Sequence, residues 1–281
     1  MLKQRVITAI ILAAILLGSV FGLELQWFTA VMSVFFVAAA WEWSRLAHCD
    51  SVFTRSLYTL VMSAGMAAML HWLGLLSGRI DSSNVQIVVS IAAVWWVIAA
   101  VLVKNYPALS SLWNNPVLQT VIGILVIFPT LAAMVLLRSE PNGAWLIVIM
   151  VVCVACADIG AYFVGRKFGK RKLAPAVSPG KSMEGFYGGF ACSALFALIL
   201  MFALSEFGAK PLDWRLLLVI VPASLASVLG DLLESMLKRA RGIKDSGRIL
   251  PGHGGVLDRM DSISAAAPIF TLGYLLSGWG W

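Results

Sequence analysis

Carboxylates, basic side chains and glycines gather in the last third of the chain, and these residues are the best suited to chemistry. In Asp231-Leu-Leu-Glu-Ser-Met-Leu-Lys-Arg, positions 231, 234, 235 and 238 follow the i, i+3, i+4, i+7 spacing of one helical face. That face offers two carboxylates, a hydroxyl and an ammonium group. A solvated helix end could carry the same pattern by chance, so the residues that follow it decide between the two interpretations.

A basic loop with several glycines follows this helix and ends in a pair of aspartates. It reads Lys244-Asp245, then Leu250-Pro-Gly-His-Gly-Gly255, then Asp258-Arg-Met-Asp261. Glycine permits sharp turns close to a ligand, and paired aspartates are hard oxygen ligands that suit Mg²⁺ beside phosphates. Arginine can hold phosphate oxygens through two parallel hydrogen bonds. The segment therefore indicates a site for a metal ion and a phosphorylated ligand.

A second loop, residues 165–184, also suits a polyphosphate, because it combines fixed positive charge, glycines and hydroxyls. The basic run Arg166 to Lys172 alone is explained by membrane topology. The turn expected at Ser178-Pro-Gly-Lys-Ser182 is harder to explain in that way.

Two carboxylates lie where burial is costly. Asp158 is within an apolar segment and Asp231 is late in another, and an unpaired charge there costs several kcal/mol. Each needs a partner or an ion. A buried ion pair between helices is the alternative to a functional role, and it is the stronger alternative for Asp158.

Composition places the chain in a membrane. Of 281 residues, 60% are hydrophobic and 12% are charged, which is about half the charged share of a soluble domain. We expect an all-α, polytopic membrane protein with about nine transmembrane helices, since nine segments are apolar over about 20 residues. They lie at 6–25, 27–46, 56–77, 85–103, 117–137, 144–164, 185–204, 214–237 and 262–280.

Basic residues orient these segments, because lysine and arginine favour cytoplasmic loops. A cytoplasmic N-terminus puts most of them on the cytoplasmic side: Lys3, Arg5, Arg45, Arg55, Lys104, the run 166–172, Lys181, the run 238–244, Arg248 and Arg259. The other side keeps only Arg79, Arg138, Lys210 and Arg215. The net charge of +7 thus reflects loops beside anionic headgroups, and no nucleic-acid partner is expected.

The chain divides at about residue 140. Residues 1–140 are expected to be a transmembrane scaffold, in which Trp41-Glu-Trp-Ser-Arg45 fits an interfacial belt with a charge pair. Residues 141–281 are expected to be the catalytic region, with cytoplasmic loops at 165–184 and 238–261.

The stretch from Ser235 to Asp261 resembles the signature of the phosphatidate cytidylyltransferases, also called CDP-diacylglycerol synthases. Every fixed position is filled: Ser235, Lys238, Arg239, Lys244, Asp245, Leu250, Pro251, His253, Gly254, Gly255, Asp258, Arg259 and Asp261. The resemblance extends to Asp158-Ile-Gly-Ala-Tyr-Phe-Val-Gly165 and to the 178–185 segment, so it covers most of residues 144–281. The first half is similar only in being a set of spans.

The resemblance implies a multi-pass enzyme of the bacterial inner membrane, active on the cytoplasmic face. It would convert CTP and phosphatidate into CDP-diacylglycerol and pyrophosphate, with Mg²⁺ as cofactor. It implies metal ligands at Asp231 and Asp258 and catalytic residues at Asp231, Lys238, Asp258 and Asp261. It implies substrate-binding residues at Lys167, Ser178, Lys181, Ser235, Arg239, Lys244, Asp245, His253 and Arg259.

Several alternatives stay open at this stage. His253 either donates to a phosphate or only shapes its turn. A second metal ion, a monovalent cation and a homodimer are open. A CTP-dependent polyprenol-type kinase would use the same loops and metal, and a transporter would explain an intramembrane Asp158, although the charges cluster on one membrane face.

Overall fold

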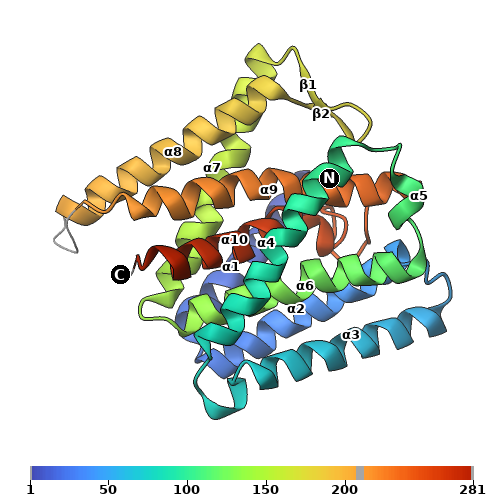
Figure 1. Ribbon diagram of the computed structural model, residues 1–281, viewed down its shortest axis with the longest axis horizontal. Coiled ribbons are helices and arrows are strands. Elements are labelled where there is room, and N and C mark those ends of the chain that lie inside the picture. The colour runs from blue at the N-terminus through green and yellow to red at the C-terminus, as the bar shows by residue number, and fades with distance from the viewer. Residues whose placement is uncertain (1, 207–211, 280–281) are drawn as a thin grey trace.

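The computed structural model describes residues 2–206 and 212–279, which form a helix bundle with one short hairpin (Figure 1). The helices are α1 (Leu2–Gly22), α2 (Leu25–Leu46), α3 (Val52–Trp72), α4 (Ser82–Lys104), α5 (Ser110–Trp113), α6 (Pro116–Ser139), α7 (Gly143–Phe168), α8 (Met183–Glu206), α9 (Arg215–Ala240) and α10 (Leu257–Ser277). A 3₁₀ turn at Leu75–Ser77 follows α3, and the strands are β1 (Lys172–Ala174) and β2 (Ser178–Ser182).

Each of the nine apolar segments overlaps one long helix over most of its length; segment 56–77 extends past α3 into the 3₁₀ turn, and residue 280 lies outside the described residues. Within residues 2–206 and 212–279, six helices are long and apolar enough to cross a membrane, namely α2, α4, α6, α7, α8 and α9. The predominantly helical, multi-span class is therefore confirmed. Spanning by α1, α3 and α10 stays a prediction.

The hairpin is the departure from an all-α chain, and the turn expected at 178–182 is wrong. These residues form β2, which pairs antiparallel with β1. The turn lies at 174–177, where the Val177 amide donates to the Ala174 carbonyl at 3.1 Å. Pro175 is the second residue of that turn, where the fixed φ of proline is favoured.

Side-chain caps set where several helices begin. The Ser51 hydroxyl accepts from the amide of Thr54 at the start of α3. The Asp81 carboxylate caps α4, and Asn115 caps α6 just before Pro116. Each cap satisfies amides that the first helical turn leaves without a backbone partner.

Outer helices present apolar side chains to their surroundings. On α4, exposed Ile87, Ile91, Val94 and Ile98 follow one helical stripe, whereas Val89 and Ala92 on the other faces are buried. An exposed apolar stripe of this length on a long helix suits contact with lipid.

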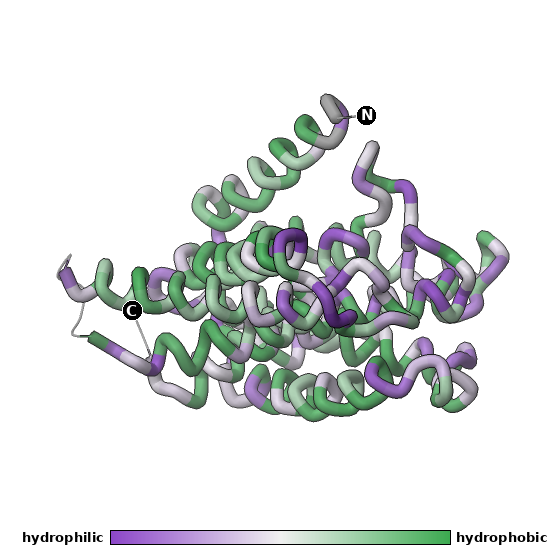
Figure 2. The backbone as a smooth tube through the Cα atoms, turned by 90° about the horizontal axis from the view of Figure 1, so that it is seen from above, coloured by the Kyte–Doolittle hydropathy of each residue, from purple (hydrophilic) through white to green (hydrophobic). Residues whose placement is uncertain are grey.

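Loops that the charge pattern assigns to the cytoplasm contact one another at one end of the bundle. The His48 ring bonds the Asn114 side chain at 3.1 Å, and Arg241 pairs with Asp50 at 3.0 Å. Figure 2 shows hydrophilic residues gathered at this end, on the right of the view, with the more hydrophobic helices extending to the left. At the opposite end, hydrogen bonds join Arg138 to Leu23, Tyr274 to Glu140 and Arg215 to Gly278.

This arrangement supports the alternation on which the predicted topology rests. Lys210 lies outside the described residues, as do the side chains of Lys3 and Arg5. The orientation relative to a membrane stays a prediction.

Helices α9 and α10 pack closely because α9 carries glycine at the crossing point. A Cβ on Gly230 would overlap the carbonyl oxygen of Asp261 and lie 3.2 Å from the Cβ of Ala265. No other residue type allows the two backbones to approach so closely. Because of this contact, Asp231 on α9 and Asp261 on α10, both expected to be catalytic, lie on closely packed helices.

We predict that Gly230→Ala destabilises the protein. Forcing a methyl group against a backbone carbonyl costs about 1–3 kcal/mol, so the thermal unfolding midpoint in detergent should fall by several degrees. Gly18→Ala on α1 is the control, because nothing lies within 4 Å of a Cβ there and alanine favours the helix. An equal midpoint for both variants would contradict the close packing.

Candidate active site

A largely buried lysine, with 12% of its side chain exposed, lies between two carboxylates at the centre of the candidate site. The Nζ of Lys238 is 2.9 Å from Glu234 Oε1 and 2.7 Å from Asp258 Oδ1. Glu234 is 3% exposed and Asp258 is 8% exposed. Because Glu234 and Lys238 are one helical turn apart on α9 while Asp258 begins α10, this triad joins the two helices.

Asp258 is also bound by the loop between these helices. Its carboxylate accepts from the amides of Ser246, at 3.0 Å, and Gly255, at 2.8 Å. Burial by itself raises the pKa of this carboxyl, but the hydrogen bonds from Lys238 and Gly255 outweigh it and hold the Asp258 pKa at about 2. Asp258, which precedes the expected span at 262–280, is therefore a fixed anion around which the loop folds.

A second ion pair connects the hairpin to α9. Lys181 on β2 lies 2.6 Å from Asp231 Oδ2, and the Ser235 hydroxyl donates to Asp231 Oδ1 at 3.2 Å. Glu184 fixes the base of the hairpin by accepting from the amides of Lys170 and Arg171. Asp231 therefore has an ion-pair partner, but that partner is on a strand and the two side chains are 27% and 31% exposed, so this is not the buried pair between helices considered as the alternative.

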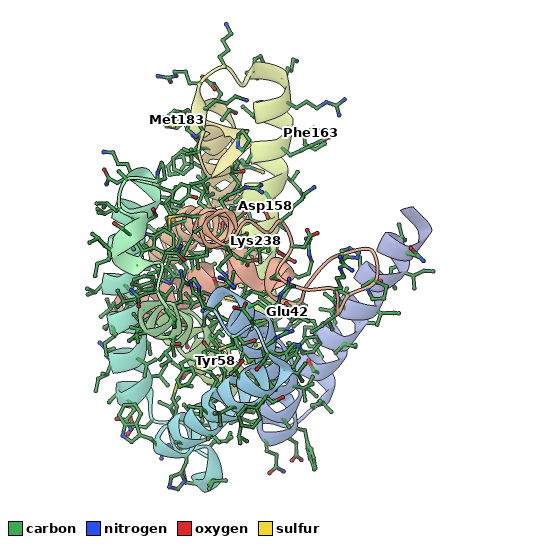
Figure 3. All side chains as sticks on the ribbon, turned by 90° about the vertical axis from the view of Figure 1, so that its right-hand side faces the viewer. Glu42, Tyr58, Asp158, Phe163, Met183 and Lys238 are labelled. Carbon is green, nitrogen blue, oxygen red and sulfur yellow. The ribbon has the colours of Figure 1, made fainter. Side chains whose placement is uncertain are left out.

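Asp158 makes no ion pair within the described residues. It is exposed to a cavity of about 350 Å³ between α7 and the hairpin, which Lys181 also lines. Arg166 and Tyr162 complete its polar wall. Figure 3 shows Asp158 above Lys238 and Glu42 on the face that holds the candidate site.

A second cavity, of about 730 Å³, is formed by the loop 244–254. Four residues expected to bind substrate line it, together with Arg248: Lys244, Asp245, His253 and Arg259. The loop folds back on itself through a hydrogen bond from the Leu250 amide to the Gly254 carbonyl at 2.9 Å. Positive φ angles of 76° and 85° at Gly252 and Gly254 permit that reversal.

Three residues expected to bind substrate lie outside these clusters. Lys167 is exposed and lies over the ring of Phe168, Arg239 is exposed on α9, and Ser178 pairs with Ala174 at the start of β2. In the described part of the chain, none of these three side chains bonds a side chain of the triad Glu234, Lys238 and Asp258.

Glu42 is a buried member of the site that the sequence pattern did not identify. It is 1% exposed, and its Oε2 accepts from the Leu257 amide at 2.8 Å and the Ser246 hydroxyl at 3.1 Å. A Cβ on Gly247 or Gly255 would overlap its carboxylate. The interpretation of Glu42 as part of an interfacial charge pair with Arg45 is therefore wrong, because neither residue bonds the other in the described part of the chain. An acidic residue in a long apolar helix was the signal available.

The charge balance of the site fits a divalent cation. Two ammonium groups, Lys181 and Lys238, face the four carboxylates Asp231, Glu234, Asp258 and Asp261, and Glu234 Oε2 is buried with no partner. Buried charges require compensation, and with all four carboxylates ionised the cluster would carry two excess negative charges, which a divalent cation would balance. Among the described residues no three His, Cys, Asp or Glu side chains already form a ligand set, so phosphate oxygens would have to complete one.

Comparison with known proteins identifies the class. The model of the cytidylyltransferase family matches residues 3–276, and the chain belongs to this family. It is 44% identical over 283 residues to a phosphatidate cytidylyltransferase of Pseudomonas aeruginosa, covering 100% of this chain and 99% of that protein. It is 38% identical over 289 residues to the phosphatidate cytidylyltransferase of Haemophilus influenzae, covering 98% and 99% of the two chains.

A relative from Staphylococcus epidermidis with the same name is 47% identical over 136 residues, which cover 48% of this chain and 50% of that protein. The family model and the two full-length relatives show family membership along the chain, including residues 1–140, for which the sequence alone indicated only a set of spans.

We predict that Glu42 positions the loop between α9 and α10. The Glu42→Ala substitution removes the acceptor for the Leu257 amide and the Ser246 hydroxyl. Each buried donor left without a partner lowers the free energy of unfolding by about 1–3 kcal/mol. Amide hydrogen exchange across residues 244–257 should therefore become at least about tenfold faster. Glu24→Ala, at the exposed start of α2, is the control. Unchanged exchange in Glu42→Ala would exclude the positioning role.

Proposed function

We propose that this protein transfers the cytidylyl group of CTP to phosphatidate, giving CDP-diacylglycerol and pyrophosphate, as the names of its full-length relatives indicate. The observation that carries the proposal is a partly buried cluster of lysines and carboxylates with basic cavities beside it, on the end of the bundle assigned to the cytoplasm. The relatives' names favour neither the kinase nor the transporter.

The aspartates of this cluster are the proposed ligands of Mg²⁺. Asp231 and Asp258 would hold the ion, with Asp261, three residues after Asp258 on α10, facing Asp231 on α9. When bound, Mg²⁺ neutralises the triphosphate and the charge that develops on the leaving pyrophosphate. Both proposed ligands already pair with lysines. Substrate phosphates would compete for these same lysines and so free the carboxylates.

The reaction proposed is in-line attack by the phosphatidate phosphate on the α-phosphorus of CTP. The attacking oxygen forms the new P–O bond as the bond to pyrophosphate breaks. A phosphate monoester already carries between one and two negative charges near neutral pH, so no strong general base is required. Positioning and charge neutralisation by Lys181, Lys238 and Arg259 would supply most of the rate.

An apolar cavity beside the basic loop supports a lipid substrate. It measures about 140 Å³ and is lined by side chains of α1, α2 and α10, including Leu16, Phe36 and Ile263. Leu250 and Arg259 line both this cavity and the basic cavity of the loop. A phospholipid would place its phosphate at Arg259 and an acyl chain among the apolar side chains. Figure 2 shows α1 standing apart from the bundle, so the apolar cavity lies beside a loosely packed helix.

We predict that Asp231→Asn and Asp258→Asn each lose activity. Removing one ligand charge should lower CTP-dependent turnover by at least about 100-fold, as the loss of a single group that stabilises transition-state charge does. The Mg²⁺ concentration needed for half-maximal rate should rise. The measurement is formation of labelled CDP-diacylglycerol from labelled CTP, with pyrophosphate quantified in parallel.

Asp213→Asn is the matched control, because Asp213 lies at the opposite end of the bundle, before α9. Near-normal turnover by both active-site variants would contradict the metal assignment. Release of CDP together with a phosphorylated lipid would instead identify a kinase.

We also predict that two basic residues act on different substrates. Arg259→Gln should raise the KM for phosphatidate by about tenfold or more with a smaller effect on the KM for CTP, since a charge-assisted hydrogen bond contributes about 1.5–3 kcal/mol. Lys181→Gln should do the reverse. Each variant is the control for the other. Equal effects on both KM values in both variants would exclude separate lipid and nucleotide positions.

A further inference from the structure

A fourth cavity lies between α2, α3 and the segment after α9, and it is rich in arginine. It measures about 240 Å³. Its lining residues are Arg45, Cys49, Asp50, Arg55, Arg241 and Ile243. The Ile243 amide donates to the Lys238 carbonyl at 3.0 Å, but no lining side chain bonds a side chain of the lysine and carboxylate triad in the described part of the chain.

The positive charge in this cavity is incompletely balanced. Arg241 pairs with Asp50 at 3.0 Å, and the Asp50 side chain is 83% exposed. Across residues 2–206 and 212–279, Arg45 and Arg55 have no carboxylate within 4.0 Å. Two partly buried guanidinium groups therefore face one space without a counterion, an arrangement that an anion would stabilise.

The arginines are held in place, which lowers the entropy lost when a ligand binds. Arg55 donates to the Ser44 hydroxyl at 3.1 Å and the Trp41 carbonyl at 3.2 Å, and its guanidinium lies 4.0 Å from the centre of the Trp41 ring. Arg45 donates to the Ser246 carbonyl at 3.2 Å. Both keep other N–H groups that bond nothing in the described chain.

We propose that this cavity binds a phosphate group, separate from the substrates of the active site. Arginine holds phosphate oxygens through paired, charge-assisted hydrogen bonds, and Arg45, Arg55 and Arg241 supply the donors. Both a phospholipid headgroup and a free phosphate offer this chemistry. The neighbouring start of α3 favours the headgroup, because Val52 and Phe53 there are 71% and 77% exposed.

A phosphate bound in this cavity would affect the loop between α9 and α10 through Arg45. Arg45 bonds the carbonyl of Ser246, and the amide of Ser246 bonds Asp258. Arg241 also donates to the Arg45 carbonyl at 3.0 Å. A phosphate that draws the Arg45 guanidinium into the cavity would thus change the hold on the loop that carries Asp258.

Cys49 provides a direct probe, since its free thiol lines the cavity. The full-length protein is kept in a maltoside detergent, which carries no phosphate, and alkylation of Cys49 by N-ethylmaleimide is followed by peptide mass spectrometry. Inorganic phosphate is added in one arm and phosphatidylglycerol in another, against chloride at equal ionic strength. At about ten times the dissociation constant, alkylation should slow by about tenfold, in proportion to the free fraction.

Arg55→Gln should raise the ligand concentration needed for protection by about tenfold or more, and Arg55→Lys should do so less. Arg79→Gln, an exposed arginine beyond the far end of α3, should behave as the parent. Protection by the lipid alone identifies a headgroup, and protection by both ligands identifies the phosphate group itself. No protection by either ligand, or protection that a folded Arg55→Gln variant retains unchanged, overturns the proposal.

Discussion

The structure of the candidate site depends on one largely buried lysine. Lys238 lies between Glu234 and Asp258, so it joins α9 to α10 and makes the burial of two carboxylates tolerable. Asp258 in turn organises the loop by accepting from Ser246 and Gly255. Without that lysine the two helices would present the uncompensated negative charges of Glu234 and Asp258 to each other. The same lysine therefore joins the two helices and balances the negative charge of the site.

The same constraint explains why the first half of the chain takes part in the site. Asp258 accepts from only some of the hydrogen-bond donors in and beside the loop between α9 and α10. Glu42 on α2 accepts from two others, the Leu257 amide and the Ser246 hydroxyl. Carboxylates on two sides of the loop thus hold it, one from each half of the chain. The basic cavity of about 730 Å³ is consequently built on a framework whose hydrogen-bond partners come from distant parts of the sequence.

Hydropathy predicted the helices well, because in lipid a long apolar segment must satisfy its own backbone. The helical stripe from Asp231 to Lys238 was also correctly read, since its periodicity is local. Glu42 was missed because its role exists only through contacts with residues 204 and 215 positions away. The 178–182 strand was mistaken for a turn because proline and glycine within it outweighed its pairing with β1. Lys167 and Arg239 carry the right charge, but charge alone does not say which way a side chain points.

The ion pair between Lys181 and Asp231 has a thermodynamic consequence. While it is intact, the lysine occupies the position that an incoming cation would take, and the aspartate occupies the position that an anionic ligand would take. Under the proposed assignment, a nucleotide that recruits Lys181 would expose Asp231, and a cation that recruits Asp231 would release Lys181. By linkage the two ligands must strengthen each other's binding by the same factor. The resting pair thus makes their binding cooperative and disfavours half-assembled complexes.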